Sequence, residues 1–302
     1  MKQVNILMST YNGEKFLVKQ LDSIFAQTYS SFTLYVRDDG STDQTVSILE
    51  EYKNKLSDPD RMVIFKEKNV GFCASFFQLL KATPEGDYWT FSDQDDIWYE
   101  KKIEHAIGWM ESDENRDSEK PLMYHSGIEY IDETDAPTGR YEIHYSYDFQ
   151  KSITSNIFYG FAMTINRSMR ECLVCCHSEN ILYHDWFIAM IAAGFGKWHF
   201  SHQVDAAHRI HTQNTSPTNM FKKIPLIKKL FTGDKFYTKN ASEFYEHFLD
   251  RLSEKDQKVL ELFILTDSKF KKCFKKAFYP ARWNPRLPEE LVLRFLMLIG
   301  LI

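Results

Sequence analysis

Short apolar runs alternate with amphipathic segments over residues 1–115 of this chain. Residues 4–8 form a run typical of a buried strand, and the apolar residues that follow recur at helical spacing. Further strands are expected at 32–36, 62–65 and 88–91, and helices at 17–25, 46–56, 72–80 and 103–110. Because strands and helices alternate at this pitch, the sequence predicts an α/β fold with a doubly wound, mostly parallel sheet.

The remaining residues divide into two stretches. Residues 116–215 show the alternation less clearly, with a strand expected at 163–165 and a helix at 182–193. Residues 216–302 read as helical, aromatic and basic. We therefore expect an α/β domain over 1–215, with halves at 1–115 and 116–215, and a helical C-terminal region over 216–302.

Charge is distributed unevenly between these parts. Residues 216–302 carry 17 Lys and Arg against 10 Asp and Glu, whereas the remainder carries 20 basic against 32 acidic residues. Because residues 216–302 are basic and the rest of the chain is acidic, we expect residues 216–302 to have a separate role, in contact with an anionic surface.

The sequence also predicts a compartment. Its longest apolar stretch, 295–302, is too short to span a bilayer, and the first residues lack the build of a signal peptide. Five cysteines, an odd number without an export signal, favour a reducing environment. We expect a cytoplasmic protein.

Three of the predicted strands lead directly into polar clusters, at residues 9–12, 38–43 and 93–96. In sheets of this kind, ligands bind in the crevice outside the carboxyl ends of the strands, at the point where the strand order reverses. The clusters are therefore expected to converge on one site.

The acidic cluster at 93–96 has the clearest chemistry. Mg²⁺ and Mn²⁺ favour oxygen ligands, and often bind one or two carboxylates together with substrate phosphates. A solvated acidic turn or a helix cap before Trp98 would account for the same residues. A calcium loop of the EF-hand type is excluded because its required Gly and its final Glu are missing. A magnesium or manganese site is favoured.

The cluster at 38–43 allows two interpretations. A capped turn accounts for Ser41 and Asp43, but leaves the adjacent carboxylates of Asp38 and Asp39 unexplained. A carboxylate here is suited to accept hydrogen bonds from a base or from ribose hydroxyls. No G-x-G-x-x-G follows the first strand, so a dinucleotide-binding site is disfavoured.

Two later clusters are weaker when taken alone. Asp185 lies at the start of a predicted helix, where a carboxylate is often only a cap or a partner of the helix dipole. Arg209, between His208 and His211, is suited to phosphate. No G-x-S-x-G occurs, so a hydrolase triad lacks its nucleophile.

Together these clusters resemble family 2 glycosyltransferases with the GT-A fold, especially rhamnosyltransferase-like members of bacterial polysaccharide pathways. The resemblance covers residues 4–214. Its motifs, in order, lie at 9–13 (STYNG), 38–43 (DDGSTD), 69–71 (NVG), 93–98 (DQDDIW), 166–167 (NR), 184–186 (HDW) and 209–211 (RIH). The domain 1–215 would then comprise a nucleotide-sugar half and an acceptor half.

The resemblance implies a role for each matched residue. The donor-binding residues are Thr10, Tyr11, Asn12, Asp38, Asp39, Asn69, Gly71, Asp93 and Arg209. The metal ligands are Asp95, Asp93 and His211, and Asp185 is the catalytic base. His184 and His208 depart from the family pattern, which often has Glu and an aromatic residue there, and this leaves the acceptor contacts open.

The implied activity is inverting transfer of one sugar, with rhamnose as a candidate, from a UDP- or dTDP-linked donor to a glycan acceptor carried on a lipid. Mg²⁺ or Mn²⁺ is the implied cofactor, cell-surface polysaccharide the implied product, and no nucleic acid takes part. Residues 279–283 end like the Q-x-x-R-W motif of processive synthases but lack its Gln, which favours single addition. A sugar-phosphate nucleotidyltransferase would need a Gly-rich basic loop after the first strand; a non-catalytic sugar-binding scaffold on the same fold is the other alternative.

The C-terminal region allows two interpretations as well. Phe270, Phe274 and Phe278 recur every four residues among lysines, and residues 222–229 also combine lysines with an apolar run. An aromatic stripe beside basic residues suits the surface of an anionic membrane. A helical bundle that packs its Phe stripe inward, with its lysines facing water, would show the same pattern.

Overall fold

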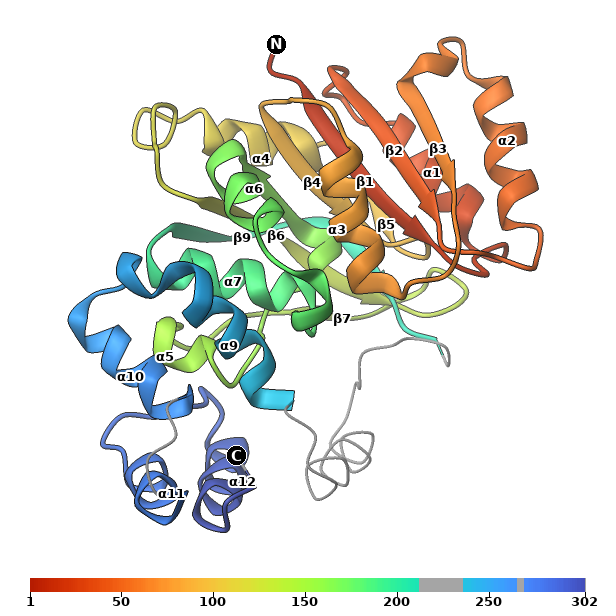
Figure 1. Cartoon of the computed structure of the whole chain (residues 1–302). Coiled ribbons are helices and arrows are strands. Elements are labelled where there is room, and N and C mark those ends of the chain that lie inside the picture. Colours follow the sequence, from red (N-terminus) through yellow and green to blue (C-terminus); the bar gives the residue numbers. More distant parts are fainter. Residues whose placement is uncertain (212–235, 265–268, 302) are drawn as a thin grey trace. The chain divides into compact units, whose positions relative to one another are not determined.

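The computed structural model describes residues 1–211, 236–264 and 269–301 (Figure 1). They form two compact units. Unit 1 comprises 1–143, 158–178 and 196–211, and unit 2 comprises 144–157, 179–195 and the described residues after 211. The division into domains at 1–215 and 216–302 remains a prediction.

Unit 1 contains a mixed sheet of nine strands with the order β3-β2-β1-β4-β8-β6-β9-β5, and β7 pairs with β6. The strands are β1 (Val4–Thr10), β2 (Phe32–Asp38), β3 (Met62–Lys66), β4 (Tyr88–Ser92), β5 (Ile97–Trp98), β6 (Leu122–Ile131), β7 (Pro137–Tyr141), β8 (Met163–Asn166) and β9 (Lys197–Arg209). Strands β1 to β4 are mutually parallel, and β6 is parallel to β9, whereas β8 is antiparallel to both β4 and β6. The predicted α/β fold with a mostly parallel, mixed sheet is confirmed.

Helices follow the early strands, as predicted. Those of unit 1 are α1 (Leu17–Phe25), α2 (Thr45–Lys55), α3 (Phe72–Ala82), α4 (Lys102–Met110) and α6 (Arg167–Val174), with short 3₁₀ turns at η1 (Pro59–Arg61) and η2 (Gly160–Ala162). The apolar stripe of α1 (Leu17, Leu21, Ile24) is fully buried in one core cluster with β1. Residue 44 occupies the N-cap position of α2 without a side-chain cap hydrogen bond, but Asp43 accepts from the N–H of Thr45, the first residue of the helix, at 3.0 Å.

Unit 2 is helical. It contains α5 (Phe149–Ser152), α7 (His184–Gly194), α9 (Phe236–Phe248), η5 (Leu249–Arg251), α10 (Glu254–Ile264), α11 (Lys269–Ala277) and α12 (Leu287–Leu298), and η3 (Ser178–Asn180) begins at the end of unit 1. A Cβ on Gly194 would lie 2.9 Å from Leu252 Cδ2 and 3.1 Å from Phe149 Cδ2, so glycine permits the close packing at the end of α7.

The described part of the predicted C-terminal region is helical, as expected. Within the described ranges, no helix is both long and apolar enough to cross a bilayer. Residues 212–235, which include the basic segment at 222–229, lie outside the described residues, as do the side chains of 269–272.

Candidate functional site

The carboxyl ends of β1, β2, β4 and β9 lie at one edge of the sheet of unit 1. The first three strands are parallel neighbours, and β9 runs in the same direction because β4 and β6 are each antiparallel to β8. The strand order reverses between β1 and β4, since β2 and β3 continue on the far side of β1 (Figure 1). The polar clusters after these strands are thus brought to the position where α/β sheets bind ligands.

Two of the three residues predicted to hold a metal, Asp95 and His211, meet across this edge. Nε2 of His211, two residues after β9, lies 2.6 Å from Oδ2 of Asp95, which follows β4. The His211 ring also lies 5.4 Å from the ring of Phe16, centroid to centroid. Asp93, at the end of β4, is partly exposed.

Asp95 and His211 offer a carboxylate oxygen and an imidazole nitrogen that suit a divalent cation of the magnesium or manganese type, whereas Asp93 does not form a preformed three-ligand cluster with them among the described residues. Adjacent ligands of an octahedral ion with bonds of about 2.1 Å lie roughly 3 Å apart. The Asp95 and His211 atoms are already near that separation. The two carboxylates supply the oxygen ligands that both ions prefer.

Arg209 fixes the backbone of Asp95 by a side-chain hydrogen bond. Its guanidinium is fully buried, and it donates from Nε to the Asp95 carbonyl (2.9 Å) and from Nη1 to the Asp132 carbonyl (2.9 Å). Nη1 also pairs with Asp135 at 2.5 Å. Asp135 has a positive φ of 70° in the turn between β6 and β7. Direct contact of Arg209 with a donor phosphate remains a prediction.

A buried ion pair joins the two segments that carry the metal candidates. Nδ1 of His208 lies 2.9 Å from Oδ1 of Asp96, and the same oxygen accepts from the Arg209 backbone N–H at 3.0 Å. Burial alone would lower the pKa of His208, but the Asp96 carboxylate outweighs burial and raises it to about 8. A protonated His208 thus fixes the end of β9 against residues 95–96.

Gln94 connects the acidic cluster to the loop after β1. Its Oε1 accepts from the backbone N–H of Tyr11 at 2.8 Å, and its Nε2 donates to the Tyr11 carbonyl at 3.0 Å. A Cβ on Gly13 would lie 2.3 Å from Oε1 of Gln94, so only glycine leaves room for this side chain. The Tyr11 side chain is exposed.

Asp38 and Asn12 fasten the loops after β1 and β2 together. The buried Asp38 carboxylate accepts from Thr10 Oγ1 (3.1 Å) and from the Ser41 backbone N–H (2.9 Å). Asn12, at a positive φ of 48°, accepts at Oδ1 from the Thr42 N–H (2.8 Å), and its own N–H donates to Ser41 Oγ (2.9 Å). These contacts shape the turn that carries Asp39.

Asp39 binds the loop after β3. Its carboxylate is buried, pairs with Arg37, and accepts from the N–H groups of Val70 (2.8 Å) and Gly71 (2.9 Å). Gly71 has a positive φ of 85°, a conformation that favours glycine. The exposed Asn69 lies beside Gly40, where a Cβ would approach its backbone nitrogen to 3.1 Å. The predicted residues at 38–39 and 69–71 therefore form one connected cluster.

Asp185 belongs to unit 2. It lies in the first turn of α7, half-buried, and its Oδ1 accepts from the Trp186 N–H at 2.7 Å. Trp186 is itself fixed by a hydrogen bond from Nε1 to the Ser152 carbonyl at 2.5 Å. Burial lowers the pKa of the neighbouring His184 to about 3, so this imidazole is neutral.

Sequence reasoning missed several supporting residues of unit 1. They are Arg37, Gln94, Asp96 and the turn residues Asp132 and Asp135, while His208 was named without its pairing to Asp96. Gln94 and Asp96 lie within the recognised DQDD motif, so the motif pointed to them without separating their roles. Nothing in the spacing of Asp132 and Asp135 linked that turn to Arg209.

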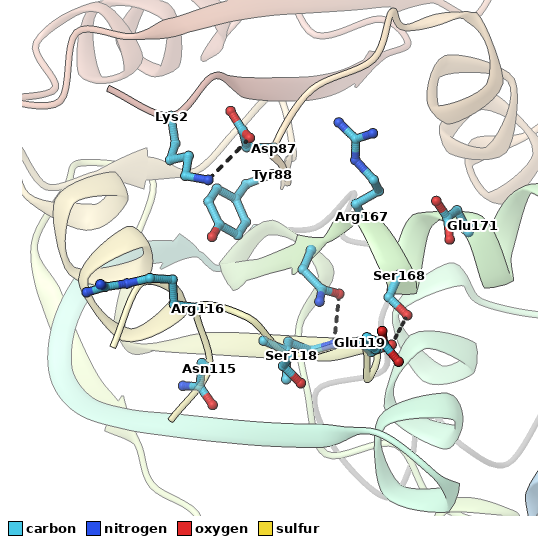
Figure 2. A pocket seen from close by; sticks show the side chains of 12 residues that line it. Lys2, Asp87, Tyr88, Asn115, Arg116, Ser118, Glu119, Arg167, Ser168 and Glu171 are labelled. Atoms are coloured by element: carbon cyan, nitrogen blue, oxygen red, sulfur yellow. Dashed lines mark hydrogen bonds and ion pairs between the residues drawn. The ribbon is translucent and has the colours of Figure 1, made fainter. Parts of the chain in front are cut away.

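A polar pocket of about 370 Å³ lies at the opposite edge of the sheet, near the starts of β1, β4 and β6 (Figure 2). Its cations are neutralised locally: Lys2 faces Asp87 at 3.7 Å, Arg116 lies 3.5 Å from Asp113, and Arg167 lies 3.2 Å from Glu85. The pocket holds none of the residues predicted for the site.

Comparison with known proteins decides the family. A family model described as Glycosyl transferase family 2 matches residues 5–174, more than half of the chain. The chain belongs to this family. The resemblance inferred from the ordered motifs is confirmed, and the protein is a glycosyltransferase.

Relatives of this glycosyltransferase include the dTDP-rhamnosyl transferase RfbG of Shigella flexneri, which is 29% identical over 258 residues, 80% of this chain and 85% of that protein. An uncharacterized glycosyltransferase of Rickettsia prowazekii, RP339, is 26% identical over 222 residues, 71% of this chain and 66% of that protein.

Two solved structures share the fold. Residues 1–349 of TarS from S. aureus, in complex with UDP-GlcNAc, match 99% of this chain and 81% of that chain with a TM-score of 0.58 and 16% identity. The mannosyltransferase PcManGT from Pyrobaculum calidifontis, in complex with GDP-Man and Mn²⁺, matches 99% of this chain and 74% of that chain with a TM-score of 0.54 and 14% identity. These likenesses confirm the GT-A-type fold.

Proposed function

We propose that this glycosyltransferase moves one sugar, with inversion, from a UDP- or dTDP-linked donor to a glycan acceptor in cell-surface polysaccharide synthesis. The observation that carries the proposal is the approach of Asp95 and His211, which join the ends of β4 and β9 into one ligand pair. Rhamnose is the candidate sugar, because the relative RfbG is named a dTDP-rhamnosyl transferase.

The nucleoside half of the donor is assigned to the loops after β1, β2 and β3. Asp38, Asn12 and Asp39 connect these loops by hydrogen bonds, which gives a rigid binding surface before the donor arrives. The exposed Tyr11 ring is suited to lie against a base. Preorganisation of this kind lowers the entropic cost of binding.

The diphosphate is assigned to the acidic edge. Asp95, with Asp93 and His211, would hold Mg²⁺ or Mn²⁺, which supplies positive charge to the departing diphosphate when it is bound. Arg209 and the Asp96–His208 pair keep these side chains in place. The complex of PcManGT with GDP-Man and Mn²⁺ supports a divalent cation in this fold.

Asp185 is proposed as the general base, on the strength of the HDW motif and its partly accessible carboxylate. It takes the proton of the acceptor hydroxyl while that oxygen bonds to the anomeric carbon. The bond from this carbon to the diphosphate oxygen breaks on the opposite face, and the nucleoside diphosphate leaves. A single displacement inverts the anomeric centre.

The acceptor is proposed to be lipid-linked, and the protein to work in the cytoplasm at the inner face of the membrane. The basic composition of residues 216–302 supports contact of that region with anionic lipid.

The test is release of nucleoside diphosphate from a panel of UDP-, dTDP- and GDP-linked sugars, with Mn²⁺, Mg²⁺ or a chelator. We expect one UDP or dTDP donor to be hydrolysed or transferred in a metal-dependent manner. Release of pyrophosphate from a nucleoside triphosphate and a sugar phosphate would indicate nucleotidyl transfer instead. Turnover that a chelator leaves unchanged would contradict the metal assignment.

A further inference from the structure

Helices α11 and α12 of unit 2 pack against each other and carry an exposed apolar face among the described residues. We call it the α11–α12 face, and it comprises Phe274, Phe278, Leu287, Leu291, Phe295 and Ile299. Phe278 is 64% exposed and Phe295 is 60% exposed. Large exposed apolar side chains that gather on one helix pair suggest an interaction surface.

The face is not a consequence of loose packing. The opposite side of α12 is buried through Leu293, Leu296 and Met297. Glu290 caps the preceding turn by accepting from the N–H groups of Trp283 (2.9 Å) and Asn284 (2.7 Å). Both helices are therefore held from within unit 2, and the exposed side chains are displayed on an ordered support.

The spacing along α12 places three of its exposed apolar residues in one row, beside the exposed Val292 and Leu298. Leu287, Leu291 and Phe295 recur every four residues, and Ile299 continues the row just past the helix. The ring of Phe274 on α11 stacks on that of Phe278, which follows the end of the helix, with centroids 4.9 Å apart.

The helix pair that carries this face is positively charged. The described side chains of residues 273–301 include five Lys and Arg against two carboxylates, a net charge of +3. Glu290 pairs with Arg294, Glu289 lies 3.5 Å from Arg286, and Lys276 is buried. The other two cations of this segment, Lys275 and Arg282, are exposed. Lys275 lies beside Phe274 in the sequence.

The charge decides between the two simplest occupants. A second copy of this chain seated on the face would bring two positively charged surfaces together, and like charges across an interface oppose association. An anionic bilayer satisfies both features, because apolar side chains enter the boundary of the acyl chains while cations remain at the headgroups. A helix of twelve residues is about 18 Å long, so α12 is suited to lie in the interface rather than to span it.

We propose that the α11–α12 face is a docking surface for anionic lipid bilayers, with Leu291 and Phe295 entering the membrane boundary. This inference rests on the proposed function, because docking would give the enzyme access to the proposed lipid-linked acceptor. Its physical basis is separate from transfer chemistry, because docking needs neither donor nor metal.

The test is co-sedimentation of the full chain with vesicles of phosphatidylcholine, with or without phosphatidylglycerol, in the absence of donor. We expect binding only with phosphatidylglycerol, and less binding as salt rises. Leu291→Asp with Phe295→Asp should lower the partition coefficient by at least about tenfold, since each removes a large apolar side chain. Lys275→Glu should lower it about fivefold or more. Val18→Asp, which changes an exposed apolar residue of α1, is the matched control.

Several outcomes would overturn the proposal. They are absence of binding to phosphatidylglycerol vesicles at low salt, equal binding by the Leu291 and Phe295 variant, and concentration-dependent dimers that this variant abolishes. Circular dichroism and release of nucleoside diphosphate by the same variants report folding and catalysis separately. A variant that loses vesicle binding but keeps donor turnover would support the docking proposal. Absence of donor turnover in the unmodified chain would contradict the proposed function and leave the docking proposal unaffected.

Discussion

The side-chain amide of Gln94 pairs with the backbone of Tyr11, accepting from its N–H at 2.8 Å and donating to its carbonyl at 3.0 Å. One residue of the acidic cluster thereby fixes the loop assigned to the nucleoside. The two halves of the proposed donor site are connected through this amide.

Gln94→Ala should therefore weaken donor binding without unfolding the protein. Two hydrogen bonds, each worth on the order of 1 kcal/mol, hold the loop, so we expect the donor Kd to rise about tenfold. Gln94→Glu keeps the acceptor for the Tyr11 N–H and loses the donor, and should give an intermediate Kd. Calorimetric titration with the nucleoside diphosphate measures the effect, and an unchanged Kd in Gln94→Ala would separate this contact from donor binding.

Asp95→Asn should preserve the fold and remove most metal-dependent activity. The amide keeps the size of the carboxylate but not its charge, so both the cation and the pairing with His211 are weakened. We expect kcat/KM to fall by at least about 10–100-fold. Asp60→Asn, at an exposed position of η1, is the control. Near-normal turnover of Asp95→Asn would exclude Asp95 as a metal ligand.

Asp185→Asn should separate binding from chemistry. Asparagine retains the oxygen that accepts from the Trp186 N–H, so the start of α7 is expected to remain intact. Transfer should fall by about 10²–10⁴, the usual contribution of a positioned general base, with donor affinity nearly unchanged. Glu179→Gln, an exposed carboxylate in η3, is the control. If donor affinity falls as far as the rate does, the role of Asp185 is structural.

Lys102 is a buried lysine that lowers the free energy of unfolding by an amount that depends on pH. Its Nζ lies 3.9 Å from the Trp98 ring centroid and 3.3 Å from Thr90 Oγ1, and burial lowers its pKa to about 7. The unfolded chain, with a pKa near 10.4, binds more protons than the native state between these values, so stability rises with pH in that window. Lys102→Met should stabilise the protein by a few kcal/mol, about 2–4 at pH 7 or below, and by less as pH approaches 10.

Urea denaturation at pH 6, 8 and about 9.5 checks this prediction. A gain in the free energy of unfolding that stays constant across the series would show that the lysine is not the titrating group. Loss of stability in Lys102→Met at every pH would show that the contact with Thr90 and Trp98 outweighs the burial of charge.

The first half of the fold was predictable because its strands and helices are regular. The apolar period of β1 and α1 reports directly which side chains are buried. Strands β6 and β9 were not predicted, because their buried residues include His125 and Asp205, which break an apolar pattern. These polar groups are buried with specific partners: His125 Nε2 accepts from the Tyr159 N–H at 3.0 Å, and His105 lies 2.8 Å from Asp205.

The site shows the same limit. The resemblance named Asp95 and His211, but their approach across 116 positions of sequence depends on the pairing of β6 with β9, which no local pattern encodes. The full burial of Arg209 was likewise outside the reach of the sequence, since its partner Asp135 lies in a turn between two strands that were not predicted.

That turn sets a trade-off between backbone strain and buried charge. Asp135 holds a left-handed conformation that glycine would adopt more easily, so Asp135→Gly would relieve about 1 kcal/mol of strain. The same change would remove the half-buried carboxylate that pairs with a fully buried guanidinium, at a cost of roughly 1.5–3 kcal/mol. The loss of the ion pair costs more than the relief of strain gains. Aspartate is therefore more stabilising than glycine at position 135, because its carboxylate pairs with Arg209, the cation that supports the backbone of Asp95.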